Sequence, residues 1–393
     1  MDKIILSLLS IAFVLTDWKI GLFTFGDIFL FLTVGLVAVK KYSNITANQI
    51  IIILGVLSVT LLNILLNNSF NVDYSISDSV AGGCKILIYL FSIIYLYNYI
   101  KNKRLEVMFL GILSSTAVII CILGIYISIS ILLKGLLPYK FFWEFTRTDL
   151  SSYMYRGWGN IIRTRSLFSE PGYLGYYLNA VLGLLYFNKV KFEIKKSTDI
   201  IITLTILATF SFGAILTMIA IKSIKYLNYA KLMGFLRDRK VIVGLLIITG
   251  ILIKMWDLFE ETLIIRFQEV LSGADTSATA RISGSWSYIN YDNILLGNGL
   301  GNTPPIWNVY AYILSDLGLI VFCVCILFNF RIFLANYKIG IVLLLLNFQK
   351  GGYLASGFWI TLLLVCIYSF ELFKAERGLL CTQNEKLISK ENQ

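Results

Sequence analysis

The sequence predicts an all-α, polytopic membrane protein with about 11–12 transmembrane helices, some of them short or broken. Composition is the first observation: 58% of the 393 residues are hydrophobic, 15% are charged, and the mean hydropathy is +0.78. Soluble proteins are about 45–50% apolar and about 25% charged. Apolar runs also recur along nearly the whole chain. We therefore expect a single membrane domain over residues 1–373 and a polar cytoplasmic tail over 374–393.

Taken in chain order, the apolar runs give the positions of the helices. They predict helices at 4–16, 26–39, 48–67, 81–100, 105–133, 168–187, 198–210, 213–231, 241–258, 306–330, 339–349 and 353–373. Breaks at 211–213 and 349–352 divide two of these regions into short pieces. Thirteen helical residues span about 20 Å, short of the roughly 30 Å apolar core. Such broken pairs are tolerated where they are buried or line a cavity.

The distribution of lysine predicts the topology. Most lysines fall in short loops or in the tail, which the positive-inside trend assigns to the cytoplasmic side together with both termini. The long loops at about 134–167 and 259–305 then lie outside. The same trend, with the anionic inner leaflet, explains the net charge of +11 without a nucleic-acid partner.

Arginine runs against this trend, because six of the eleven arginines fall in the two outer loops. The planar guanidinium suits bidentate recognition of phosphate or carboxylate. This pattern favours an anionic, lipid-linked substrate with its head group at the outer surface. The alternative is pairing with loop acids or contact with lipid phosphates. The first loop is also rich in aromatic residues, which indicates either an interfacial belt or stacking against sugars.

Several kinds of chemistry are missing from the chain. It has no histidine, so the commonest general base and the commonest metal ligand are both absent. Its six cysteines show neither a disulfide framework nor a metal-binding spacing. We therefore expect no metal site and no cofactor.

The stretch Arg163-Thr-Arg-Ser-Leu-Phe-Ser-Glu-Pro-Gly-Tyr173 places charge where a polar loop enters an apolar helix, and Pro171 suits the start of that helix. In the second loop, Arg281-Ile-Ser-Gly-Ser-Trp286 precedes Leu296-Gly-Asn-Gly-Leu-Gly301. That glycine pattern follows no strand and lacks a lysine, so we interpret it as a tight turn over a cavity mouth rather than a nucleotide loop.

These motifs resemble the signatures of bacterial polysaccharide polymerases of the Wzy type, which belong to the O-antigen ligase-like superfamily. The likeness rests on Arg163-(x)4-Phe168-Ser-Glu170-Pro171-Gly-Tyr173, on Arg281-(x)4-Trp286 with the glycine segment, and on Asn308-x-Tyr310 in the next helix. Trp307 stands where the ligases have histidine, which favours a polymerase. The resemblance implies a GT-C-like, metal-independent glycosyltransferase in the plasma (inner) membrane of a bacterium. It would act on undecaprenyl-diphosphate-linked oligosaccharide in making capsule, exopolysaccharide or O-antigen, with a flippase and a chain-length regulator as candidate partners.

The resemblance also suggests roles for individual residues. Arg163 and Arg281 would stabilise the departing diphosphate, with Arg165 and Arg266 as further substrate-binding candidates. Glu170 would be the general base, or simply a carboxylate that is favoured by the helix N-terminus or paired with Arg165. Asn308 would bind phosphate or sugar, and Tyr173 and Trp286 would line the sugar path or pack.

Three other functions fit parts of the same sequence. A lipid-linked oligosaccharide flippase or other transporter fits the helix number, although such proteins usually place polar groups near the midplane and often show internal repeats. An O-antigen ligase fits the motifs except for the missing histidine. A non-enzymatic membrane assembly protein is the third alternative.

Overall fold

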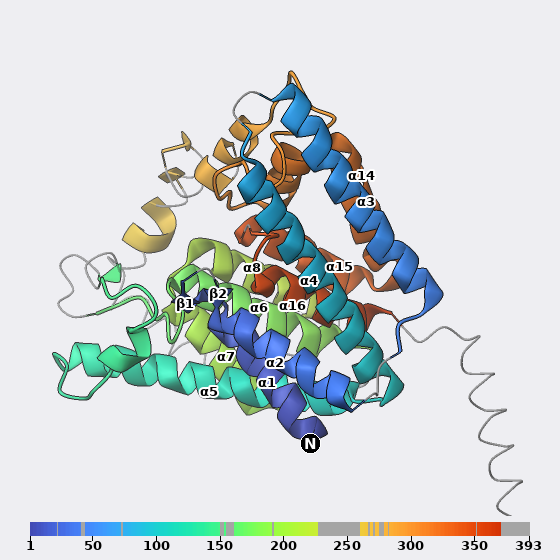
Figure 1. Cartoon of the computed structure of the whole chain (residues 1–393). Coiled ribbons are helices and arrows are strands. Elements are labelled where there is room, and N and C mark those ends of the chain that lie inside the picture. The colour runs from blue at the N-terminus through green and yellow to red at the C-terminus, as the bar shows by residue number, and fades with distance from the viewer. Residues whose placement is uncertain are drawn as a thin grey trace, which may run out of the picture.

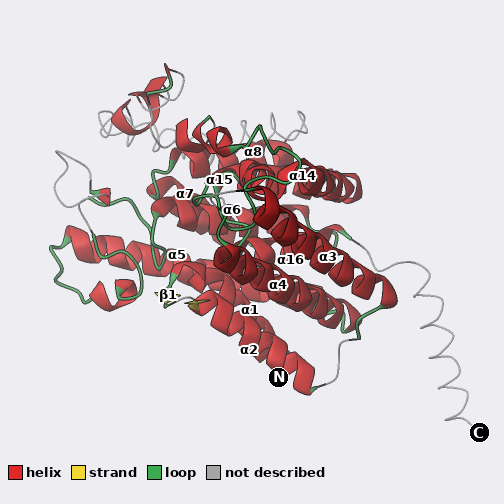
Figure 2. Ribbon diagram, turned by 45° about the horizontal axis from the view of Figure 1, so that its top comes forward, coloured by secondary structure: helices red, strands yellow, loops and turns green. Residues whose placement is uncertain are grey.

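The computed structural model describes residues 1–21, 23–40, 44–71, 74–149, 153–154, 161–190, 192–226, 260–265, 268–269, 272–274, 279–281, 283–350 and 352–370. This part of the chain is mostly helical, with a two-stranded hairpin and several loops (Figure 2). The expected helix at 241–258 and the expected tail at 374–393 lie outside the described residues.

The helices follow the apolar runs closely. They are α1 (Asp2–Val14), α2 (Phe25–Val39), α3 (Ala47–Phe70), α4 (Ile76–Asn102), α5 (Glu106–Leu132), α6 (Pro171–Phe187), α7 (Lys196–Ala208), α8 (Phe212–Tyr226), α14 (Val309–Ala335), α15 (Tyr337–Gln349) and α16 (Ser356–Ser369). Strands β1 (Lys19–Ile20) and β2 (Phe23–Thr24) form a small antiparallel hairpin between α1 and α2. Single turns occupy Leu15–Asp17, Lys140–Trp143, Glu260–Ile265 and Gly284–Tyr288.

Four of the described helices, α3, α4, α5 and α14, are long and apolar enough to cross a membrane. Their exposed side chains are largely apolar, as Ile51 and Leu65 on α3 and Leu327 on α14 illustrate. Such faces would be unstable in water and are stable against lipid, because lipid tails are themselves apolar. The described part of the chain therefore has the architecture of an all-α membrane protein.

The ends of the helices form two groups. At the first, which we call the basic end, Lys103 lies 3.2 Å from Asp2 and Lys222 lies 3.1 Å from Asp199. At the other, the loop end, α6 begins, α7 is followed by α8, and α15 is followed by α16. The described parts of both long loops lie on the side of the loop end (Figure 1). Which of the two ends faces the cytoplasm stays a prediction from the charge pattern.

The two expected helix breaks are present. Helices α7 and α15 have 13 residues each, and their partners α8 and α16 have 15 and 14. A third break was not expected, because the sequence predicts one helix over 306–330. Gly318 in α14 has φ +76° and ψ −177°. A Cβ at this position would lie 2.2 Å from the carbonyl oxygen of Leu295, so only glycine fits. Residues before the break are buried, whereas many after it are exposed.

The glycine-rich segment 296–303 packs inside the helical body at the loop end. Asn63 of α3 accepts a hydrogen bond from the backbone amide of Leu300 at 3.1 Å. From the other side, the buried carboxylate of Asp316 on α14 accepts one from the amide of Thr303 at 2.9 Å. Positive φ angles at Gly297, Gly299 and Gly301 give the expected tight turn, which is anchored to helices on two sides. Its expected place over a cavity mouth stays a prediction.

Candidate functional site

The N-terminus of α6 is the centre of the candidate site. Pro171 occupies the first turn, where its missing N–H costs no hydrogen bond. Glu170 precedes it in an extended conformation, and its side chain does not cap the helix. Instead, one carboxylate oxygen of Glu170 lies 3.2 Å from Nη1 of Arg147. Because Arg147 is 59% exposed, this ion pair contributes little stability, and the Glu170 carboxylate remains half-buried beside the start of the helix.

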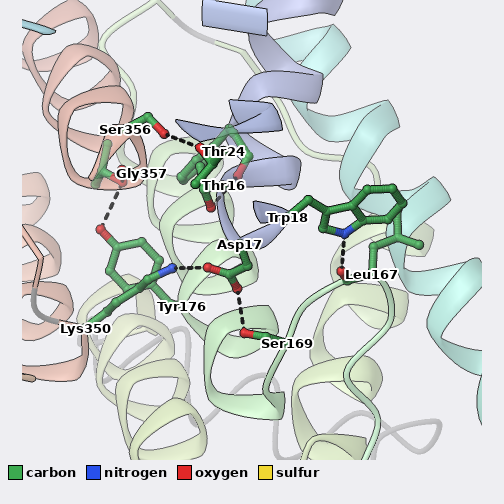
Figure 3. A network of polar contacts seen from close by, with 12 residues as sticks. Thr16, Asp17, Trp18, Thr24, Leu167, Ser169, Tyr176, Lys350, Ser356 and Gly357 are labelled. Atoms are coloured by element: carbon green, nitrogen blue, oxygen red, sulfur yellow. Dashed lines mark hydrogen bonds and ion pairs between the residues drawn. The ribbon is translucent and has the colours of Figure 1, made fainter. Parts of the chain in front are cut away.

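A second ion pair in the site joins the end of α15 to the turn that follows α1. The Lys350 ammonium, directly after α15, lies 2.9 Å from a carboxylate oxygen of Asp17, which ends the single turn that follows α1 (Figure 3). Their side chains are only 16% and 8% exposed. Ser169 Oγ donates to the other oxygen of Asp17 at 3.3 Å. The ammonium also lies 3.9 Å from the centre of the Tyr173 ring, a close cation–π contact.

Tyr173 connects this pair to Arg281 through an aromatic bridge. Its ring centre is 6.1 Å from that of Trp307, and the Arg281 guanidinium lies 5.7 Å from the Trp307 ring. Arg281, Trp307, Tyr173, Lys350 and Asp17 therefore form a continuous series of contacts. The series joins the second long loop to α14, α6, the α15–α16 break and the end of α1.

Arg163 approaches α6 at the break between α7 and α8. Its Nε donates to the carbonyl oxygen of Thr209 at 3.2 Å, at the C-terminus of α7, where the helix dipole favours a cation. The next residue continues this attachment, because the amide of Thr164 donates to the carbonyl of Ala208 at 2.9 Å. The α7–α8 break also lies against α6, since a Cβ on Gly172 would be 3.6 Å from Ser211 Oγ.

Arg165 has different surroundings from Arg163. Its side chain is fully buried, and the guanidinium lies 3.6 Å from the centre of the Trp143 ring. It donates to the carbonyl oxygens of Ser169 and Arg147. Burial lowers the pKa of the Arg165 guanidinium to about 10, so it remains cationic at neutral pH. These contacts favour a structural role for Arg165, which fixes the first loop against the start of α6.

Two aromatic residues of the first loop, Trp143 and Tyr153, pack around this buried arginine. Trp143 and Tyr153 belong to a small core at the end of α5, separate from the main one. The members of this core are Ile127, Ile131, Tyr139, Trp143, Tyr153 and Ile162. Two further aromatics of the loop, Tyr155 and Trp158, lie outside the described residues. The loop is therefore held by its own apolar cluster, which positions the arginines that follow it.

The remaining candidates are placed less centrally. Asn308 is buried, and its side-chain oxygen caps α14 by accepting from the amides of Tyr310 and Ala311. Trp286 is half-buried against the main core. Arg266 lies outside the described residues.

The site combines guanidinium and ammonium groups around one helix N-terminus at the end of an apolar bundle. No cluster of three potential metal-ligating side chains occurs among the described residues. Sequence reasoning missed Asp17, Lys350 and Trp307 as members of the site. The available signal for Lys350 was a charge at a break between two apolar runs, and Asp17 similarly follows the first apolar run.

Comparison of the chain with protein-family models, with curated proteins and with solved structures finds no match.

Proposed function

We propose that this protein is a polysaccharide polymerase of the outer face of the bacterial plasma membrane. It would transfer a growing glycan from undecaprenyl diphosphate onto a lipid-linked repeat unit. The observation that carries the proposal is the grouping of cations around the α6 N-terminus, at the loop end of a membrane-type helical body. A diphosphate on a polyprenyl lipid has the matching chemistry, because its charge requires cations and its tail requires lipid.

The proposed reaction needs little chemistry from the protein beyond positioning and charge. An acceptor hydroxyl attacks the anomeric carbon of the donor glycan, and the bond from that carbon to the diphosphate oxygen breaks. Negative charge grows on the leaving diphosphate, and fixed cations lower the barrier to its departure. Arg163 and Arg281 are assigned to this role. Glu170, with its half-buried carboxylate, is assigned to accept the proton of the hydroxyl.

Reconstitution tests this function directly. Purified protein in lipid vesicles, supplied with a lipid-linked repeat unit, should form glycans longer than one repeat. We expect Arg163→Ala and Arg281→Ala each to lower the rate by about 100- to 1000-fold, the usual loss when one stabilising group is removed from a developing anion. Arg163→Lys should also be impaired, because an ammonium lacks the bidentate fork.

The outcomes separate the alternatives as well. Translocation of the lipid-linked unit without longer glycans would indicate a flippase. Transfer of glycan only to a different acceptor would indicate a ligase. Normal chain lengths in both alanine variants would refute the assignment of the two arginines.

A further inference from the structure

The proposed mechanism leaves Lys350 unused, although Lys350 is among the least exposed cations of the site. A buried ion pair is poor evidence for a stabilising role, because removing two charges from water costs about as much as their attraction returns. An apolar pair would hold α1 to the α15–α16 break equally well. Holding the helices together therefore does not by itself explain why Lys350 and Asp17 occupy these positions.

We propose that Lys350 binds the diphosphate of the lipid-linked glycan as a third cation, and that Asp17 orients its ammonium before the substrate binds. The inference rests on the proposed function and adds a substrate-contacting residue to it. An ammonium can donate three hydrogen bonds. Among the described residues, Asp17 accepts one at 2.9 Å, the Tyr173 ring covers another direction at 3.9 Å, and the Tyr176 ring is a more distant neighbour at 5.8 Å. Capacity remains for an oxygen of a ligand.

The residue before Lys350 gives an independent indication of a ligand. The side-chain oxygen and nitrogen of Gln349 are both buried, and neither has a hydrogen-bond partner within the described parts of the chain. A Cβ on Gly213 would lie 3.7 Å from Gln349 Nε2, so the amide faces the α7–α8 break that Arg163 also contacts. A sugar hydroxyl both donates and accepts, and would satisfy such an amide. Two consecutive residues at the end of α15 thus have hydrogen-bonding capacity left over, a cation suited to the diphosphate and an amide suited to a sugar hydroxyl.

The two members of the ion pair have opposite expected effects on an anionic ligand. Lys350→Met removes an attractive charge, so diphosphate binding should weaken. Asp17→Asn removes a repulsive charge at the same place, so binding should tighten provided that Lys350 stays in position. If the pair served only to hold the helices together, both substitutions would break the same link and would shift binding in the same direction.

The experiment measures binding of undecaprenyl diphosphate to the purified full-length protein in lipid nanodiscs at low salt. We expect about 10- to 100-fold weaker binding for Lys350→Met, the usual loss of a charge-assisted hydrogen bond. Lys350→Arg should stay within about 10-fold of the wild type, since it keeps the charge. Asp17→Asn should bind more tightly than the wild type, and raised salt should reduce all these differences.

The chain contains a matched control at the basic end. Lys225 lies 3.4 Å from the centre of the Tyr186 ring and 3.8 Å from a carboxylate oxygen of Asp199, the same arrangement of lysine, aspartate and tyrosine. Lys225→Met and Asp199→Asn should leave diphosphate binding unchanged. Thermal unfolding of every variant, including Lys350→Arg, separates loss of the site from loss of the fold.

Several results would overturn the inference. Unchanged binding in Lys350→Met, or weakening of equal size in Lys350→Met and Asp17→Asn, would assign the pair to structure alone. An equal loss in the Lys225 control would assign the effect to general destabilisation. If the wild type bound no undecaprenyl diphosphate and formed no long glycan, the proposed function itself would fail. If the wild type did both and Lys350→Met behaved like it, only the role of Lys350 would fail.

Discussion

Asp316 should control the stability of the glycine-rich segment. The substitution Asp316→Asn tests this, because it replaces one hydrogen-bond-accepting oxygen by a donating NH2 group. One carboxylate oxygen accepts from the Thr303 amide at 2.9 Å. The other accepts from the Gly301 amide at 3.0 Å and from the Tyr353 hydroxyl at 2.6 Å. The side chain is completely buried.

An asparagine at position 316 cannot satisfy all three donors. If its NH2 group replaces the first oxygen, it faces the Thr303 amide, donor against donor. If it replaces the second oxygen, Tyr353 can turn its hydroxyl to accept, but the Gly301 amide loses its acceptor. Either orientation leaves one buried backbone N–H unpaired, which costs about 1–3 kcal/mol.

Hydrogen exchange measured by mass spectrometry on the peptide covering 296–303 provides the assay. A cost of about 1–3 kcal/mol corresponds to roughly 5- to 150-fold faster exchange by local opening. Asp78→Asn is the control, because Asp78 is exposed in the first turn of α4 and its substitution should leave that peptide unchanged. Unaltered exchange in Asp316→Asn would refute the view that this carboxylate holds the segment.

Two further predictions concern the framework of the site. Arg165→Lys keeps the charge and loses the planar group that stacks on Trp143 and donates to two carbonyl oxygens. We expect the free energy of unfolding to fall by about 2 kcal/mol and proteolysis of the first loop to become faster. Resistance to proteolysis equal to that of the wild type would contradict this. Gly318→Ala places a Cβ 2.2 Å from the Leu295 carbonyl oxygen at a positive φ and should cost more than about 3 kcal/mol, measured as a loss of folded protein in the membrane. Gly35→Ala, which meets nothing within 4 Å, is its control and should express normally.

The sequence was most informative where a local pattern decides the structure. Pro171 could be assigned to the first turn of α6 because its own chemistry suits that position. The break after α7 was predicted from the charge pattern, because basic clusters flank the apolar run at 198–221 on both sides and a single crossing would have placed one of them outside. Gly318 lacked such a signal, because a glycine within an apolar run is equally compatible with a continuous membrane helix.

The membership of the site depended on contacts that no local pattern contains. Asp17 and Lys350 are 333 positions apart, and only the packing of α1 against the α15–α16 break brings them together. Arg163 and Arg165 have one residue between them in an irregular loop, and only the resemblance to the polymerase motif ranked Arg163 above Arg165. The structure distinguishes them because the Trp143 cluster encloses Arg165 and leaves Arg163 half-buried at the end of α7.

The short helices beside the site have a consequence for the surrounding lipid. Helices of 13 residues, such as α7 and α15, reach about 20 Å, whereas the hydrocarbon core is about 30 Å thick. Where lipid tails lie against such short helices they would meet a hydrophobic mismatch, which local thinning of the bilayer relieves. Thinning at the loop end would bring phosphate head groups inward to the level of Lys350 and Arg163. If the proposed function holds, its lipid-linked substrate would then reach these cations while its tail stays in the membrane, and the rate of glycan polymerisation should change with bilayer thickness.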